Sequence, residues 1–164
     1  MKSIVLLLSC LLMLPVLSAK EENGMRVEVS KSTLSNNDER GSGNYYTKVD
    51  RTFGLKVQAK NTSMKPMPAG KLEWVILIER WGYSPKKVER FKGSEDFPAL
   101  KPGESITMTI GQSTVGGYKG YSDKYQDAIE GWSVIILHDG KPTISMVSSS
   151  NFAKANERAK DATP

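Results

Sequence analysis

The sequence predicts an all-β protein, a seven-stranded antiparallel sandwich with a short helix at its C-terminal end. Short segments of alternating apolar and polar residues recur along the chain, and clusters of Pro, Gly, Asn and Asp separate them. No such segment is followed by a long helical pattern, which argues against parallel β-α-β units. The 164 residues are enough for one domain with its own core.

The seven predicted strands differ in how their faces are buried. The segment from Thr52 to Lys60 alternates most regularly, which is typical of a strand with one wet face. Leu72 to Ile78 is nearly all apolar and predicts a central strand that is covered on both faces. Lys86 to Phe91 is short and charged, as edge strands often are. The other strands are expected at residues 25–30, 106–110, 132–138 and 143–148.

Turn residues and the C-terminal tail complete this prediction. Asp139-Gly140 separates the last two strands and indicates a tight hairpin, because both residues tolerate positive φ. Residues 151–164 form a tail of helical composition. In this tail Phe152, Ala155 and Ala159 would share one helix face.

The N-terminal segment has the layout of a secretory signal peptide. A short basic start is followed by an apolar run from Ile4 to Val16 and by a small residue, Ala19, before charged residues. We therefore expect a signal peptide at residues 1–19, a β-sandwich domain at 20–150 and a helical tail at 151–164. An alternative is a lipoprotein box at Leu7 to Cys10, in which Cys10 would carry the lipid; few apolar residues precede it.

Composition narrows the functional classes. Cys10 is the only cysteine, so the exported domain would hold without disulfides, which suggests a bacterial periplasmic or surface protein. Thiol catalysis and cysteine-ligated metals are excluded on the same ground. The net charge is +5, but basic and acidic residues are interspersed and no Lys/Arg run exceeds Lys86-Lys87. A mixed solvated surface is therefore expected, with no nucleic-acid partner.

No catalytic constellation is recognisable. The single histidine, His138, adjoins a predicted turn, and no Gly-x-Ser-x-Gly or phosphate-binding loop occurs. Two sets of carboxylate residues remain as candidates. The first is Glu95 with Asp96, and the second is Asp123 with Asp127 and Glu130. Their spacing matches no calcium loop, and we interpret them as structural or solvated residues. We expect no enzyme activity, no cofactor and no metal.

A long connection between two predicted strands is the best candidate for a binding site. Residues 111–130 carry three tyrosines among glycines and polar residues, a composition typical of binding loops. Trp81 and Tyr83 follow the third strand, and Tyr45 and Tyr46 follow the first. Alternatively, these aromatic residues cap the ends of the core. The candidate binding residues are Tyr118, Tyr121, Tyr125, Trp81 and Tyr83.

Three features at fixed places along the chain resemble a known class of domain. Trp74 lies in the third predicted strand, Leu100-Lys101-Pro102-Gly103-Glu104 precedes the fifth, and a hairpin closes the domain. Over residues 25–148 the chain thus resembles the immunoglobulin-like or fibronectin-III-like sandwiches of secreted bacterial proteins. It departs from that class in lacking a cysteine pair between the sheets and in opening the sixth strand with Trp132 rather than a tyrosine corner.

The resemblance implies a function in binding rather than catalysis. Domains of this kind serve in surface structures, pili and envelope adhesion, so we expect a non-catalytic exported module of the periplasm, outer membrane or cell surface. Its partner would be a protein or a second copy of itself. The alternative is a carbohydrate-binding module that uses the tyrosine-rich 111–130 segment. No integral membrane span is expected once the signal peptide is removed.

The signal-peptide assignment predicts the start of the mature protein. The exported form should begin at Lys20 and carry no acyl chain, because cleavage after Ala19 removes Cys10. Intact-mass spectrometry of the protein from its own envelope fraction measures this directly. A mature form that begins at an acylated Cys10 would establish the lipoprotein alternative instead.

Overall fold

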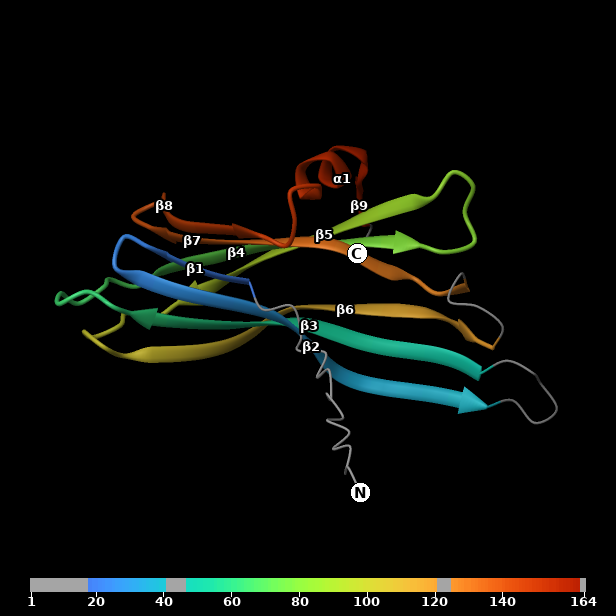
Figure 1. Ribbon diagram of the computed structural model, residues 1–164, viewed down its shortest axis with the longest axis horizontal. Coiled ribbons are helices and arrows are strands. Elements are labelled where there is room, and N and C mark those ends of the chain that lie inside the picture. Colours follow the sequence, from blue (N-terminus) through green and yellow to red (C-terminus); the bar gives the residue numbers. More distant parts are fainter. Residues whose placement is uncertain (1–17, 41–46, 121–124, 163–164) are drawn as a thin grey trace, which may run out of the picture.

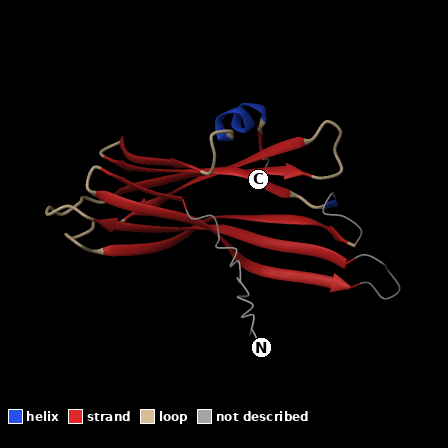
Figure 2. Ribbon diagram, in the orientation of Figure 1, coloured by secondary structure: helices blue, strands red, loops and turns tan. Residues whose placement is uncertain are grey.

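Two β-sheets face each other, and one short helix lies on the outside of one of them (Figures 1 and 2). The computed structural model describes residues 18–40, 47–120 and 125–162. The first sheet has the order β1-β2-β3-β6, with strands β1 (Ser18–Glu22), β2 (Met25–Arg40), β3 (Thr47–Asn61) and β6 (Ser105–Lys119). The second sheet has the order β8-β7-β4-β5-β9, with β8 (Lys141–Val147), β7 (Ala128–His138), β4 (Gly70–Arg80), β5 (Lys87–Phe97) and β9 (Lys160–Asp161). The helix is α1 (Phe152–Arg158).

The prediction of an all-β protein with one short helix is confirmed. Every ladder is antiparallel except the two-residue pairing of β9 with β5. The described residues form nine strands rather than the seven expected, because β1 and β9 each add a strand at the edge of a sheet. The predicted edge strand, β5, has only this short β9 on its outer side.

The core lies between the two sheets. Alternate residues of each strand point inward, as the period of two requires. Met25, Val27 and Val29 of β2, for example, are fully buried, whereas Arg26 between them is exposed. The cluster continues through the inner faces of the other strands, including Leu55, Val57, Leu72, Ile76, Ile78, Phe97, Ile110, Trp132, Val134 and Ile136.

The central strand β4 is covered on both faces only where the helix lies. Leu77 is fully buried on the outer side of the second sheet, where it packs with Phe152 and Ala155 of α1. Arg90 of β5 donates to Asn156 and Asp161 and so fixes the tail beyond the helix. This second cluster explains why the sequence of β4 is apolar without alternation.

The structure corrects the expectation of a long connection at residues 111–130. β6 continues to Lys119 and β7 begins at Ala128, so most of that segment is strand. The inward positions of this extension are Ser113, Val115 and Gly117, all buried, and their small or polar side chains hide the alternation. A bulge opposite Phe53 and Leu55 also shifts the register there.

Two hairpins use the same turn chemistry. The predicted turn at Asp139-Gly140 is confirmed, with φ of +50° and +72°. A second turn of this geometry, at Asn23-Gly24, joins β1 to β2, with φ of +50° and +74°. Strand β1 starts at Ser18, so the expected signal peptide overlaps its first two residues; residues 1–17 lie outside the described residues. The cleavage site stays a prediction.

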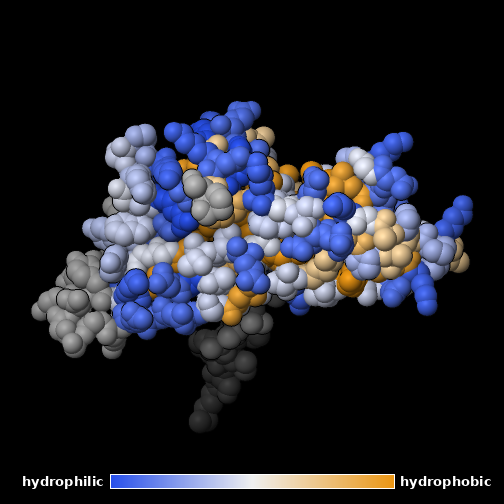
Figure 3. Space-filling view, turned by 180° about the vertical axis from the view of Figure 1, so that it is seen from behind, coloured by the Kyte–Doolittle hydropathy of each residue, from blue (hydrophilic) through white to orange (hydrophobic). Residues whose placement is uncertain are grey.

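The surface is mixed in character. Hydrophilic residues cover much of the face seen in Figure 3, and hydrophobic areas lie scattered between them. Within the described residues, no helix has the length and hydrophobicity of a membrane span.

A buried asparagine organises the pole at which β3 ends. Asn61 is fully buried, and its amide nitrogen donates to the carbonyl oxygens of Lys65 and Leu100 at 2.8 and 3.1 Å. Its amide oxygen accepts from the backbone nitrogen and the hydroxyl of Ser63 at 2.9 and 2.8 Å. All hydrogen-bonding positions of the amide are therefore used, and the loop after β3 depends on it.

Replacing this amide by a carboxylate should destabilise the fold. Asn61→Asp removes two donors and buries a charge, which we expect to cost about 3 kcal/mol of the free energy of unfolding. Urea denaturation of the variant beside Asn37→Asp, an exposed position of β2, measures the difference. An equal, small loss in both variants would show that the loop does not depend on Asn61.

Candidate binding site

Three aromatic side chains that the sequence singled out meet at the other pole of the sandwich. Trp81 follows the last residue of β4, Tyr118 lies near the end of β6, and Tyr125 precedes β7. The ring of Trp81 lies 5.8 Å from that of Tyr118 and 6.1 Å from that of Tyr125, edge to face in both pairs. We call these three residues the aromatic cluster. Such pairs stabilise each other beyond the area they bury.

The cluster combines a half-buried centre with an exposed periphery. Trp81 is half-buried, whereas 43% of Tyr118 and 45% of Tyr125 are exposed. The tyrosines therefore hold the tryptophan in place and keep half of their own surface free for contact. The sequence allowed two interpretations of these residues, a binding site or a cap on the core. The arrangement agrees with both, because the rings cap the core and remain accessible.

The other candidate residues lie elsewhere. Tyr83 is 57% exposed, and its ring faces the ammonium group of Lys87 at 5.6 Å. Tyr121 lies outside the described residues, as do Tyr45 and Tyr46. The structure thus brings together three of the five candidates.

A carboxylate below the cluster fixes the three strand ends. Asp127 accepts hydrogen bonds from the backbone nitrogen of Trp81 at 3.0 Å and from that of Gly116 at 3.2 Å. It also accepts from Nη1 of Arg80 at 2.6 Å, and only 8% of its side chain is exposed. Because Gly116 belongs to the first sheet and Trp81 follows a strand of the second, this carboxylate joins the two sheets.

Arg80 extends this connection. Its Nε donates to Glu89 at 2.7 Å and its Nη1 to the carbonyl oxygen of Thr114 at 3.2 Å, while the guanidinium lies 5.6 Å from the centre of the Phe91 ring. Burial opposes the charged form, but the hydrogen bonds to Glu89 and Asp127 outweigh it and raise the pKa of Arg80. The hydrogen bond from Lys87, together with that from Arg80, lowers the pKa of Glu89. The ion pairs are therefore kept at neutral pH.

Close backbone approach explains a glycine beneath the rings. Gly117 of β6 forms a bridge with Gln126, and Asp127 donates its backbone N–H to Gly116 at 2.9 Å. A Cβ at Gly117 would lie 2.4 Å from the carbonyl oxygen of Tyr125, so a side chain there would push the Tyr125 segment away. Gly117 thus serves packing between strands rather than loop freedom.

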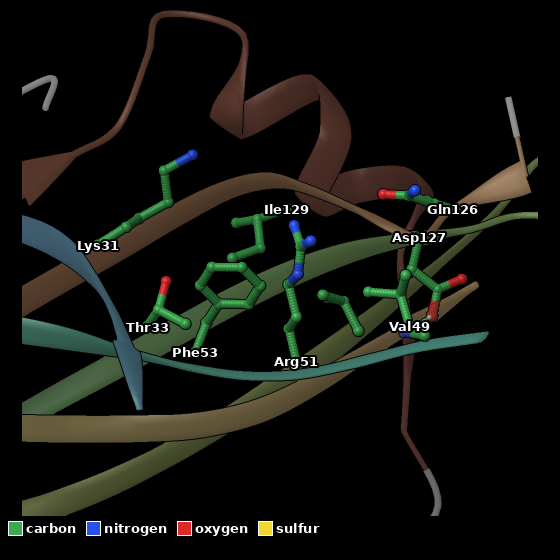
Figure 4. Close-up of a pocket in the computed structure, with 10 residues that line it drawn as sticks. Lys31, Thr33, Val49, Arg51, Phe53, Gln126, Asp127 and Ile129 are labelled. Carbon is green, nitrogen blue, oxygen red and sulfur yellow. Dashed lines mark hydrogen bonds between the residues drawn. The ribbon is translucent and has the colours of Figure 1, made fainter. Parts of the chain in front are cut away.

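A cavity of about 230 Å³ opens between the sheets beside this network (Figure 4). Figure 4 shows Phe53 and Val49 of β3 and Ile129 of β7 around it, with Arg51 between Phe53 and Val49 and Lys31 to one side. Asp127 belongs both to the cavity wall and to the support of the aromatic cluster. Its lining combines apolar side chains with two cations.

The remaining candidates for chemistry have structural surroundings. His138 is half-buried, with its ring edge-on to Phe97 at 6.0 Å and its Nδ1 2.6 Å from the hydroxyl of Thr143. Glu95 and Asp96 lie in β5, and both are exposed. Asp123 lies outside the described residues, and Glu130 pairs with Arg158 at 3.8 Å.

Sequence reasoning missed Arg80 and the partners of Asp127. The sequence predicts a structural or solvated carboxylate at Asp127, but it does not indicate which groups this carboxylate binds, since they are 11 to 47 residues away in the chain. One local signal could have indicated Arg80, which lies two residues after Ile78, the last residue of the buried run of β4. A charged side chain that is buried at the end of a strand requires a partner of opposite charge.

Comparisons with known proteins give no family. No family model matches the chain, and no curated protein matches it either. Four chains of known structure match. One of them, a protein from Akkermansia muciniphila, is 13% identical and has a TM-score of 0.39 over 88% of this chain and 84% of that chain.

Neutralising Asp127 should loosen the pole. Asp127→Asn keeps one oxygen, for the backbone nitrogen of Trp81, and places an NH2 group opposite the donors of Gly116 and Arg80. Arg80 is left with one carboxylate partner, and we expect a loss of about 2 kcal/mol in the free energy of unfolding. Asp50→Asn is the matched control, because Asp50 forms an exposed ion pair with Lys48 that should contribute within about 0.5 kcal/mol. Chemical denaturation compares the two. Equal stability of both variants would contradict a supporting role for Asp127.

Proposed function

We propose that this chain is a non-catalytic, exported interaction module whose aromatic cluster binds a protein partner. The observation that carries the proposal is the combination of half-exposed rings with a buried ionic support. Trp81, Tyr118 and Tyr125 lie at the ends of strands; Asp127 binds the backbone of Trp81, and the two tyrosines pack against the Trp81 ring. Sites on rigid elements with such supporting contacts need little reorganisation on binding.

The composition of the pole favours a protein as the partner. Binding energy at protein interfaces concentrates in Trp, Tyr and Arg side chains that are surrounded by a polar rim. Here Tyr118 lies beside charged residues of both signs. Lys48 is opposite Tyr118 in the ladder between β3 and β6, and it pairs with Asp50 at 3.2 Å.

We also propose that the sandwich is of the immunoglobulin-like, fibronectin-III-like class. The order β2-β3-β6 in one sheet and β8-β7-β4-β5 in the other supports this. In a constant-type immunoglobulin domain the first, second, fourth and fifth strands form one sheet and the third, sixth and seventh form the other. Counted without β1 and β9, this chain differs only in its fourth strand, β5, which lies in the second sheet. The predicted signal peptide and the absence of cysteine after residue 10 support a place in the bacterial periplasm, outer membrane or cell surface. Association with a pilus rests on the resemblance in sequence pattern alone.

A carbohydrate ligand is the alternative function. The exposed halves of Tyr118 and Tyr125 offer ring faces and hydroxyl groups, which suit a sugar ring as well as a peptide. Trp81, at the centre, would add a third ring. The experiment that tests the proposal therefore has a glycan arm.

Capture from the native envelope distinguishes these functions. The mature protein is immobilised beside a Tyr118→Ala/Tyr125→Ala variant and a Tyr83→Ala control, and an envelope extract is applied with and without prior protease treatment. Tyr83 is exposed and near the pole, but its ring lies against Lys87. We expect specific proteins to be retained by the unmodified protein and by Tyr83→Ala, and lost from the double variant.

The other outcomes have distinct meanings. Polysaccharide that is retained after protease treatment, and lost in the double variant, would replace the protein partner with a glycan. Equal retention by all three proteins would remove the aromatic cluster as the binding site. A melting curve of each variant shows whether the sandwich remains folded.

A further inference from the structure

Among the described residues, β1 covers the outer edge of β2 along only part of its length. The ladder between them runs from Met25 to Val29, which lies opposite Ser18, the first described residue (Figure 1). In the part of the chain that the structure describes, residues 30–40 of β2 pair with β3 alone. Every second residue of such an edge directs its backbone N–H and C=O outward, which makes the edge a template for another strand.

This edge has only part of the usual protection against pairing. Natural edge strands are protected by lysines, by proline, by short length, by bulges or by inward-pointing charged residues, and this edge has the last two. Residues 30–40 hold one lysine, Lys31, and no proline. In their middle Leu34 is 41% exposed and lies over Gly54 on the outer face of the first sheet.

A bulge places two opposite charges on one face of the edge. Lys31 lines the cavity between the sheets, and Asp38 pairs at 3.8 Å with Arg51, which lines the same cavity. In a regular strand, residues seven apart point to opposite faces. The register shift between Thr33 and Ser35 changes this, so that Lys31 and Asp38 both point inward.

We propose that two copies of this chain pair antiparallel along residues 30–40 of β2. A two-fold axis near Ser35 places Lys31 beside Asp38 of the partner subunit, and by symmetry the reverse contact forms as well. The edge is thus complementary to itself in charge, and two Leu34 side chains approach each other at its centre. The two first sheets then form one continuous sheet across the dimer.

The pairing has a consequence for the binding of partners, and this consequence rests on the proposed function. Residues 119 and 40 both lie opposite Thr47, so the aromatic cluster is at the end of the sandwich where β2 ends. Antiparallel pairing therefore directs the two aromatic clusters away from each other. A dimer could then hold two partners at once, and the linkage of its two sites would raise the overall avidity.

Charge exchange tests the pairing independently of any ligand. Lys31→Asp leaves two acidic residues on each edge, and Asp38→Lys leaves two basic ones, so each variant alone should dimerise about tenfold less tightly or not at all. An equal mixture of the two variants restores both contacts and should form a mixed dimer. Sedimentation velocity over a concentration series measures the mass of the mature protein, of each variant and of the mixture.

The controls separate this edge from other surfaces and from unfolding. Lys56→Asp makes the same charge change on the exposed outer face of β3 and should leave the dimer unchanged. Melting curves confirm that each variant is folded. A monomeric mature protein at all concentrations would overturn the proposal, as would a dimer that both edge variants leave intact.

Discussion

One carboxylate, that of Asp127, joins the two sheets at the pole that carries the aromatic cluster. The chain crosses from the first sheet to the second between β6 and β7, and at this crossing Asp127 binds backbone nitrogens from both sides. Arg80 balances its charge and donates to Thr114 of β6 as well. A β-sandwich is otherwise held by apolar contacts without direction, whereas this contact fixes how the ends of three strands lie.

The position of the rings follows from that contact. Trp81 takes its place because its own backbone nitrogen is bound, and the two tyrosines then pack edge-on against its ring. The opposite pole is organised by a neutral group, Asn61, whose amide makes three hydrogen bonds within its own loop and one to Leu100, in the connection between β5 and β6. The two poles therefore differ in kind. One is a closed loop around a buried amide, and the other presents aromatic surface over an ionic support.

Features that depend on adjacent residues could be predicted from the sequence, whereas contacts between residues distant in the chain could not. The turn at Asp139-Gly140 was predicted because its φ values depend on two adjacent residues. Asn23-Gly24 carries the same signal, but the charged residues before it belong to a strand without apolar alternation, and that strand overlaps the predicted signal peptide. Residues 30–40 of β2 were missed for a related reason, since their inner side faces a cavity bordered by Lys31 and Arg51 rather than the apolar core. The aromatic residues were chosen by composition alone, and their meeting depends on Asp127, which no spacing rule indicates.

Site-specific cross-linking in the source cells tests the central claim most directly. A photoreactive phenylalanine analogue at position 118 would report what touches the aromatic cluster, and the same analogue at position 83 serves as the neighbouring control. The account predicts a discrete cross-linked protein from position 118 that is absent at position 83. Cross-links of equal pattern from both positions, or none from position 118, would contradict a binding role for the cluster.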